Sequence, residues 1–204
     1  GGMQTLYSPI SLHDAVFGVS QNRNFVLMMT CGYLTQDLVL CYVYGSQYAD
    51  KLTQIHHALI ILAFTTGVTF DVGTYYMAIF LVNEASNIFL NANLIMASCN
   101  KPEVKRSLMY KINGILLALS FFVCRVALIT YALGCIIYSW WELAFVRNMW
   151  NTSETYKRLV CPFMTVLAFG HGLINYVWFW LILKAVRRKL LVDSSSSEKH
   201  KKDD

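Results

Sequence analysis

The sequence predicts an all-α protein: a polytopic bundle of transmembrane helices with about five spans in this chain. Hydrophobic residues make up 56% of the 204 residues and charged residues only 14%, with a mean hydropathy of +0.44. Because a soluble domain carries about 25% charged residues, too few charges remain here to cover a water-facing surface. The apolar runs are long and do not alternate strictly, which favours helices over the strands of a membrane barrel.

Five apolar runs approach the length of about 20 residues that a helix needs to cross a bilayer. In chain order these runs are Phe25–Tyr44, Ile55–Phe70, Tyr75–Met96, Ile112–Ile137 and Phe163–Leu183. The second run is short, and we expect its helix to begin nearer Lys51. The fourth is long enough to tilt or bend, and Gly134 is one weak point along it.

Basic residues in the short connections predict the orientation of the spans. The connection Cys99–Lys111 is strongly basic and is therefore expected in the cytosol. Residues 1–24 and the loop Trp141–Cys161 then lie on the lumenal side, and the serine-rich residues 190–204 form a disordered cytosolic tail. Residues 25–189 make up the membrane domain.

Two short motifs agree with this orientation. Asn151 begins an Asn-Thr-Ser glycosylation sequon in the predicted lumenal loop. Lys201 and Lys202, fourth and third from the end, match the dilysine retrieval signal of endoplasmic-reticulum membrane proteins, with an ordinary solvated tail as the alternative.

The net charge of +5 comes with no nucleic-acid recognition motif, so we expect a membrane-embedded protein without a nucleic-acid partner.

The cysteines show no paired spacing. Cys31, Cys41, Cys124 and Cys135 lie within apolar runs, where a thiol behaves as a small buried hydrophobic group. We therefore expect no disulfide framework and no metal site, and nothing in the sequence indicates a cofactor.

Ionisable residues interrupt each predicted span. A central charge costs about 2.5–3.5 kcal/mol on insertion scales, whereas each Leu or Ile returns only about 0.3–0.6 kcal/mol. These groups are therefore expected to face one another or a wet cavity. The candidate lining residues are Asp37, Glu84, Asn87, Asn91, Arg125 and His171. Glu84, Asn87 and Asn91 share one helical face, and the natural partner of Arg125 is Glu84 or Asp37.

The adjacent residues His56 and His57 are the candidate catalytic residues. Successive helical residues point about 100° apart, so a purely packing role for the pair requires two separate partners. Burial favours the neutral imidazole, which can act as a base or a nucleophile. Function and structure both stay open for this pair, while a structural ion pair is the simpler interpretation of Arg125.

Five motifs that follow one another along the chain resemble the TLC domain family, named from TRAM, LAG and CLN proteins. They are most similar to the small TLC domain-containing branch of that family. The motifs are Gly32-Tyr33-Leu34-x-x-Asp37, His56-His57, Glu84-x-Ser86-x-x-Phe89-x-Asn91, Asn113-Gly114 and Phe121-Phe122-x-x-Arg125. The resemblance implies a membrane domain of the endoplasmic reticulum or related membranes that handles lipids. It also implies spans before the first one in this chain.

The resemblance implies two competing functions, and the charged residues on every predicted helix, which could line a path, suggest a third. The first is a role in lipid homeostasis with membrane lipids as partners. The second is acyl transfer from acyl-CoA, as in the family's ceramide synthases, where the His-His pair is essential. Those enzymes continue with His-Asp-x-x-Asp, whereas this chain has Asn83-Glu84-Ala85-Ser86-Asn87, which argues against that reaction. The third is a lipid transporter or cargo receptor, although no inverted repeat is evident.

Overall fold

The described residues of the computed structural model are helical throughout, apart from short connections. They comprise residues 12–45, 50–99, 101–146 and 155–200. Five helical segments are long and apolar enough to cross a membrane: Gln21–Tyr44, Lys51–Phe70, Thr74–Ser98, Leu108–Ala144 and Thr155–Arg188. The predicted all-α class and the five spans are therefore confirmed.

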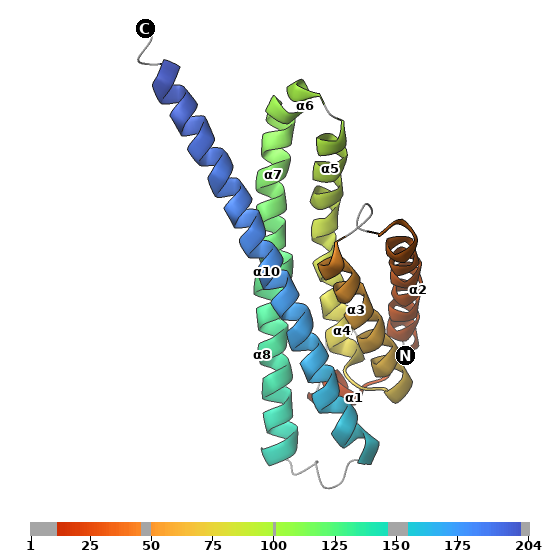
Figure 1. Cartoon of the computed structure of the whole chain (residues 1–204). Helices are drawn as coiled ribbons and strands as arrows, with labels where there is room; N and C mark the ends of the chain where they lie inside the picture. The colour runs from red at the N-terminus through yellow and green to blue at the C-terminus, as the bar shows by residue number, and fades with distance from the viewer. Residues whose placement is uncertain (1–11, 46–49, 100, 147–154, 201–204) are drawn as a thin grey trace, which may run out of the picture. The chain divides into compact units, whose positions relative to one another are not determined.

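Along the chain the helices follow one another in the order of the predicted spans (Figure 1). They are α1 (Leu12–Phe17), α2 (Gln21–Tyr44), α3 (Lys51–Phe70), α4 (Thr74–Leu81), η3 (Val82–Ser86), α5 (Asn87–Ser98), α6 (Pro102–Arg106), α7 (Leu108–Phe121), η4 (Phe122–Ala127), α8 (Leu128–Trp141), η5 (Glu142–Val146) and α10 (Thr155–His200). The second span begins at Lys51, as expected, because the Asp50 side chain caps α3 by accepting the Thr53 N–H at 2.8 Å.

The chain divides into two compact units, which we describe separately. Unit 1 comprises Gly1–Val82 and Thr130–Gly172, and unit 2 comprises Asn83–Ile129 and Leu173–Asp204. Each unit contains part of the polar constellation that the sequence predicts.

Unit 1 has two apolar cores. One joins α2 to α3 and α4 through Leu27, Cys31, Leu34, Ile60, Phe64 and Met77. The other joins α1 and α4 to α8 and α10 through Val16, Tyr76, Ile136 and Cys161, among others. A buried hydrogen bond of 2.6 Å between the Tyr76 and Ser139 hydroxyls satisfies both polar groups inside this second core.

The turn between α3 and α4 needs close backbone packing. Asp71 ends α3 in the left-handed conformation (φ 51°), and Gly73 adopts φ 70° before α4. One turn earlier, a Cβ atom on Gly67 would lie 1.9 Å from the Met77 methyl carbon and 2.8 Å from the Val72 carbonyl oxygen. Only glycine fits at residue 67 without movement of its neighbours.

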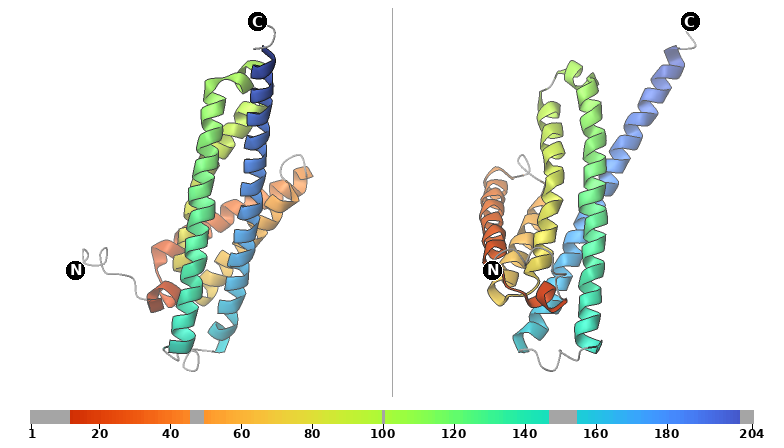
Figure 2. Two further views of the ribbon diagram at one scale, coloured as in Figure 1. Left: turned by 90° about the vertical axis from the view of Figure 1, so that its left-hand side faces the viewer. Right: turned by 180° about the vertical axis from the view of Figure 1, so that it is seen from behind.

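Unit 2 contains a helical hairpin. Helices α5 and α7 lie side by side and are joined at one end by α6 (Figures 1 and 2). Pro102 starts α6 at a position where a missing N–H costs nothing, and the Ser107 hydroxyl caps α7 by accepting the Tyr110 N–H at 3.2 Å. The Asn113 amide donates across the hairpin to the Phe89 carbonyl at 3.0 Å.

The third and fourth spans are not regular along their length. A tight 3-10 turn, η3, interrupts the third span, and a wide π turn, η4, interrupts the fourth at Phe122–Ala127. The weak point expected at Gly134 therefore lies elsewhere, because Gly134 sits inside the regular helix α8. Both irregular turns carry polar residues of the candidate site.

Helix α10 extends into the predicted tail. It continues to His200, residues 201–204 lie outside the described part, and the disordered cytosolic tail at 190–204 stays a prediction. An established helix adds each further residue with one new hydrogen bond and no new nucleation, which allows a serine-rich segment to continue it. The predicted lumenal segment 1–24 and the domain limit at residue 189 stay predictions.

The close approach at Gly67 yields a stability prediction. Gly67→Ala should lower the free energy of unfolding by about 1–3 kcal/mol, because the added methyl group overpacks the contact between α3 and the α4 turn. The midpoint of denaturant unfolding in detergent would measure this loss.

Gly32→Ala on α2 is the matched control. A Cβ at Gly32 meets nothing within 4 Å, so alanine should be neutral or stabilising by up to about 1 kcal/mol through its higher helix propensity. Equal midpoints for the two variants would contradict the tight packing at Gly67.

Candidate functional site

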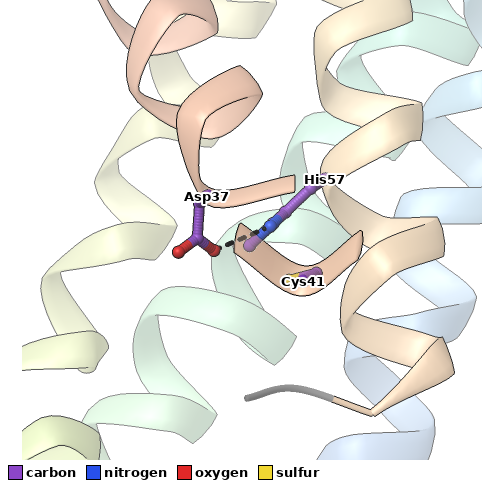
Figure 3. A group of neighbouring side chains, drawn as sticks. All are labelled: Asp37, Cys41 and His57. Atoms are coloured by element: carbon purple, nitrogen blue, oxygen red, sulfur yellow. Dashed lines mark ion pairs between the residues drawn. The ribbon is translucent and has the colours of Figure 1, made fainter. Parts of the chain in front are cut away.

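A close contact between an imidazole on α3 and a carboxylate on α2 is the main polar contact of unit 1. Nδ1 of His57 lies 3.0 Å from Oδ2 of Asp37, and the two side chains are 13% and 17% exposed. The His57 side chain reaches from α3 toward the carboxylate on α2 (Figure 3). Such a close contact between an imidazole and a carboxylate restricts the orientation of the ring. A neutral imidazole can accept a proton.

His56 points to a different partner. Its ring is 3% exposed and stacks on the His171 ring of α10, with centroids 4.8 Å apart and planes at 26°. Phe80 packs against the other histidine of this stack, with its centroid 5.5 Å from that of His171. The adjacent histidines thus have two separate partners, as the 100° rotation between successive residues requires.

Cys41 joins the His57–Asp37 pair. It lies one helical turn after Asp37 on α2, and one potential ligand atom from each of Asp37, Cys41 and His57 lies within 4.8 Å of the others (Figure 3). Cys41 is buried. The three side chains offer an oxygen, a sulfur and a nitrogen, which is a donor set that binds zinc in proteins.

Arg125 is the centre of the polar groups in unit 2. Its side chain is 4% exposed and makes an ion pair of 3.2 Å with Oε2 of Glu84. The guanidinium also donates to the Asn83 carbonyl at 3.1 Å, the Ser86 hydroxyl at 2.8 Å, the Asn87 side-chain oxygen at 2.8 Å and the Asn175 side-chain oxygen at 2.9 Å. This set of acceptors matches the fixed fork of N–H donors that only arginine carries.

Local helix geometry makes this network possible. The 3-10 turn η3 carries Asn83, Glu84 and Ser86, and α5 continues directly with Asn87. Residues in irregular helical turns have carbonyl groups that are less committed to the regular ladder, so the Asn83 carbonyl can accept from Arg125. The π turn η4 carries Arg125 itself, and the Phe121 and Trp178 rings lie 5.3 and 5.9 Å from its guanidinium carbon.

The predicted site residues thus fall into two clusters, one in each unit. Asp37, His56, His57 and His171 belong to unit 1, whereas Glu84, Asn87 and Arg125 belong to unit 2. Of the two partners predicted for Arg125, Glu84 forms the ion pair. Asn91 is exposed on α5, one turn beyond Asn87. The shared cavity and the catalytic role of the histidines stay predictions, and Asn151, Lys201 and Lys202 lie outside the described residues.

Sequence reasoning assigned no site role to four participants. Asn83, Ser86 and Asn175 accept from Arg125, and Cys41 lies beside Asp37 and His57. The spacing of four residues between Asp37 and Cys41 was a usable signal, because it places both on one face of a helix. Polar residues such as Asn175 inside an apolar run were a second signal.

The fold and its buried polar groups define a polytopic helical membrane protein. Residues 4–184 match the TLC domain family, so the chain belongs to that family, as its five motifs indicated. No solved structure matches the chain.

Curated relatives carry the same domain name. The chain is 31% identical to TLC domain-containing protein 4-A of Xenopus laevis over 50% of this chain and 38% of the relative. It is 26% identical to TLC domain-containing protein 4 of Homo sapiens over 60% of this chain and 46% of the relative. A third relative, topoisomerase I damage affected protein 4 of Saccharomyces cerevisiae, is 24% identical over 91% of this chain and 63% of the relative. The chain thus covers about two fifths to three fifths of these relatives' lengths.

The Arg125 network yields a second stability prediction. Arg125→Met should lower the free energy of unfolding by about 3–5 kcal/mol, because it removes one partner of a buried ion pair and leaves the acceptors around it unpaired. Thermal unfolding in detergent, followed by circular dichroism, would measure this loss.

Glu84→Gln is the matched control for that variant. The Glu84 side chain is 35% exposed, and glutamine keeps an oxygen acceptor for the guanidinium, so the loss should be much smaller. An Arg125→Met chain that unfolds at the same temperature as the unchanged chain would refute a structural role for the network.

Proposed function

We propose that this chain acts in membrane lipid homeostasis in the endoplasmic reticulum, and that a lipid's polar group binds at His57 and Asp37. Membership of the TLC domain family supports the lipid-related class. The observation that carries the proposal is the 3.0 Å pair between His57 and Asp37, placed on two helices that are otherwise apolar enough to span a membrane.

The chemistry of this pair suits an amphipathic ligand. Large apolar side chains such as Phe25, Met29 and Val39 are exposed along α2, where acyl chains can pack against them. The imidazole and carboxylate offer a hydrogen-bond donor and acceptors within the same hairpin. A ligand with acyl chains and a polar group bearing hydroxyl or amide functions would therefore match both parts of the surface.

Acyl transfer from acyl-CoA is the second candidate, and the same pair favours it. A carboxylate that orients an imidazole is the arrangement of a general base, which contributes about 10²–10⁴-fold to a rate. The segment Asn83–Asn87 argues against it, because its polar groups bind the Arg125 guanidinium. In this chain the segment that takes the place of the second synthase motif thus has a structural partner. Lipid homeostasis without acyl transfer is therefore the favoured function.

A lipid-composition experiment tests the proposal. Cells that lack the protein should show an altered membrane lipid profile by mass spectrometry, and re-expression of the unchanged chain should restore it. His57→Ala should fail to restore the profile, because it removes the imidazole that faces Asp37. Protein levels in the membrane fraction would be matched between variants.

His13→Ala is the matched control. His13 also lies beside an aspartate, at 3.8 Å from Asp14, but its side chain is 48% exposed. It should restore the profile fully. Full restoration of the lipid profile by His57→Ala would refute the proposal. If purified protein turns over acyl-CoA and His57→Ala abolishes that turnover, the second candidate is established in its place.

Localisation in the endoplasmic reticulum rests on Lys201 and Lys202 and a cytosolic C-terminus. Replacement of both by serine should move a tagged protein from the reticulum to later compartments, as seen by fluorescence microscopy. Replacement of Lys184, which lies 17 residues upstream of Lys201, is the control and should leave the distribution unchanged. An unchanged distribution for the double variant would contradict a retrieval signal.

A further inference from the structure

We propose that Asp37, Cys41 and His57 form a zinc-binding site in the α2–α3 hairpin. One potential ligand atom from each residue lies within 4.8 Å of the others, and Nδ1 of His57 is 3.0 Å from Oδ2 of Asp37 (Figure 3). Zinc bonds of about 2.0–2.3 Å in tetrahedral geometry place the ligand atoms about 3.3–3.8 Å apart. The 4.8 Å limit on the three atoms exceeds this range by about 1 Å, so binding requires the side chains to draw together around the ion.

The donor set selects zinc among common metal ions. A thiolate is a soft ligand that magnesium and calcium do not favour, whereas zinc accepts thiolate, imidazole and carboxylate together. Asp37 and Cys41 are four residues apart on α2, so they present ligands from one helical face, and His57 approaches from α3. Three protein ligands leave a fourth position for water.

Charge balance is consistent with a divalent ion at this site. A carboxylate, a thiolate and a neutral imidazole carry two negative charges, and Zn²⁺ neutralises both when its binding releases the Cys41 proton. A neutral assembly avoids much of the cost of charges within a membrane-spanning helix. Cys41 is 1% exposed, so its thiolate would be costly there without a cation.

The scaffold holds the three ligands in place and near one end of the hairpin. Leu34 on α2 packs in the same apolar core as Ile60 and Phe64 on α3, which fixes how the two helices face each other. Cys41 lies three residues before the end of α2 at Tyr44, and His57 lies six residues after the start of α3 at Lys51. Both residues therefore lie nearer to this end of the two helices than to their other ends.

Zinc binding by the purified chain tests this site directly. The chain in detergent would be stripped with a chelator, supplied with Zn²⁺, passed over a gel-filtration column and measured for metal content and zinc X-ray absorption. The unchanged chain should retain one zinc per chain, with one sulfur neighbour at about 2.3 Å and nitrogen or oxygen neighbours at about 2.0–2.2 Å.

Cys41→Ser should remove the sulfur neighbour and weaken zinc binding. Loss of a group that only hydrogen-bonds to a ligand costs about 10–100-fold in affinity, so loss of a ligand should cost at least about 100-fold. Cys31→Ser is the matched control, because Cys31 is a similarly buried thiol on α2 outside the cluster, and it should bind zinc like the unchanged chain.

Two results would overturn the site: no zinc retained by the unchanged chain, or the same sulfur neighbour and affinity in Cys41→Ser. Circular dichroism and gel filtration would check folding, and Asp37→Asn decides the matter if Cys41→Ser does not fold, since it should also weaken zinc binding. The lipid assay separates this inference from the proposed function. A His57→Ala defect in lipid profile together with no zinc binding would reject the metal and keep the lipid role.

Discussion

A guanidinium within a membrane-spanning helix has no water to solvate it, and unit 2 is organised around this constraint. Arg125 cannot lose its charge, so its N–H donors must all find acceptors within the protein. The tight turn η3, the wide turn η4 and α10 each contribute to that requirement. The departures from regular helix are thus where the acceptors and the donor meet.

The polar groups of unit 1 also need partners within the protein, but they are histidines and an aspartate rather than an arginine. His57 lies against Asp37 across a helical hairpin, while His56 stacks on His171. Histidine can bind or release a proton near neutral pH, and arginine cannot. Unit 1 therefore holds histidines, whose protonation state can change. Unit 2 holds Arg125, whose charge is permanent and whose hydrogen-bond partners are fixed. This contrast directs the search for chemistry to the α2–α3 hairpin.

The difference between the two polar clusters also bears on how this chain compares with its family. The chain belongs to the TLC domain family, and its resemblance to that family implied a second acidic motif after the histidine pair. Here the corresponding residues, Asn83–Asn87, bind Arg125. Family membership alone does not assign a reaction to the histidine pair, because the environment of that pair decides its role.

Composition and the length of the apolar runs determined the class of protein, the five spans and the set of polar residues that needs partners. These are properties of each helix by itself, and hydropathy along the chain records them. Only the tertiary structure decided which groups meet. Whether His56 or His57 faces Asp37, and whether Cys41 joins them, depends on the rotation and register of α2 against α3. The period of one helix defines its faces but not the partner of each face, because packing between helices makes that choice.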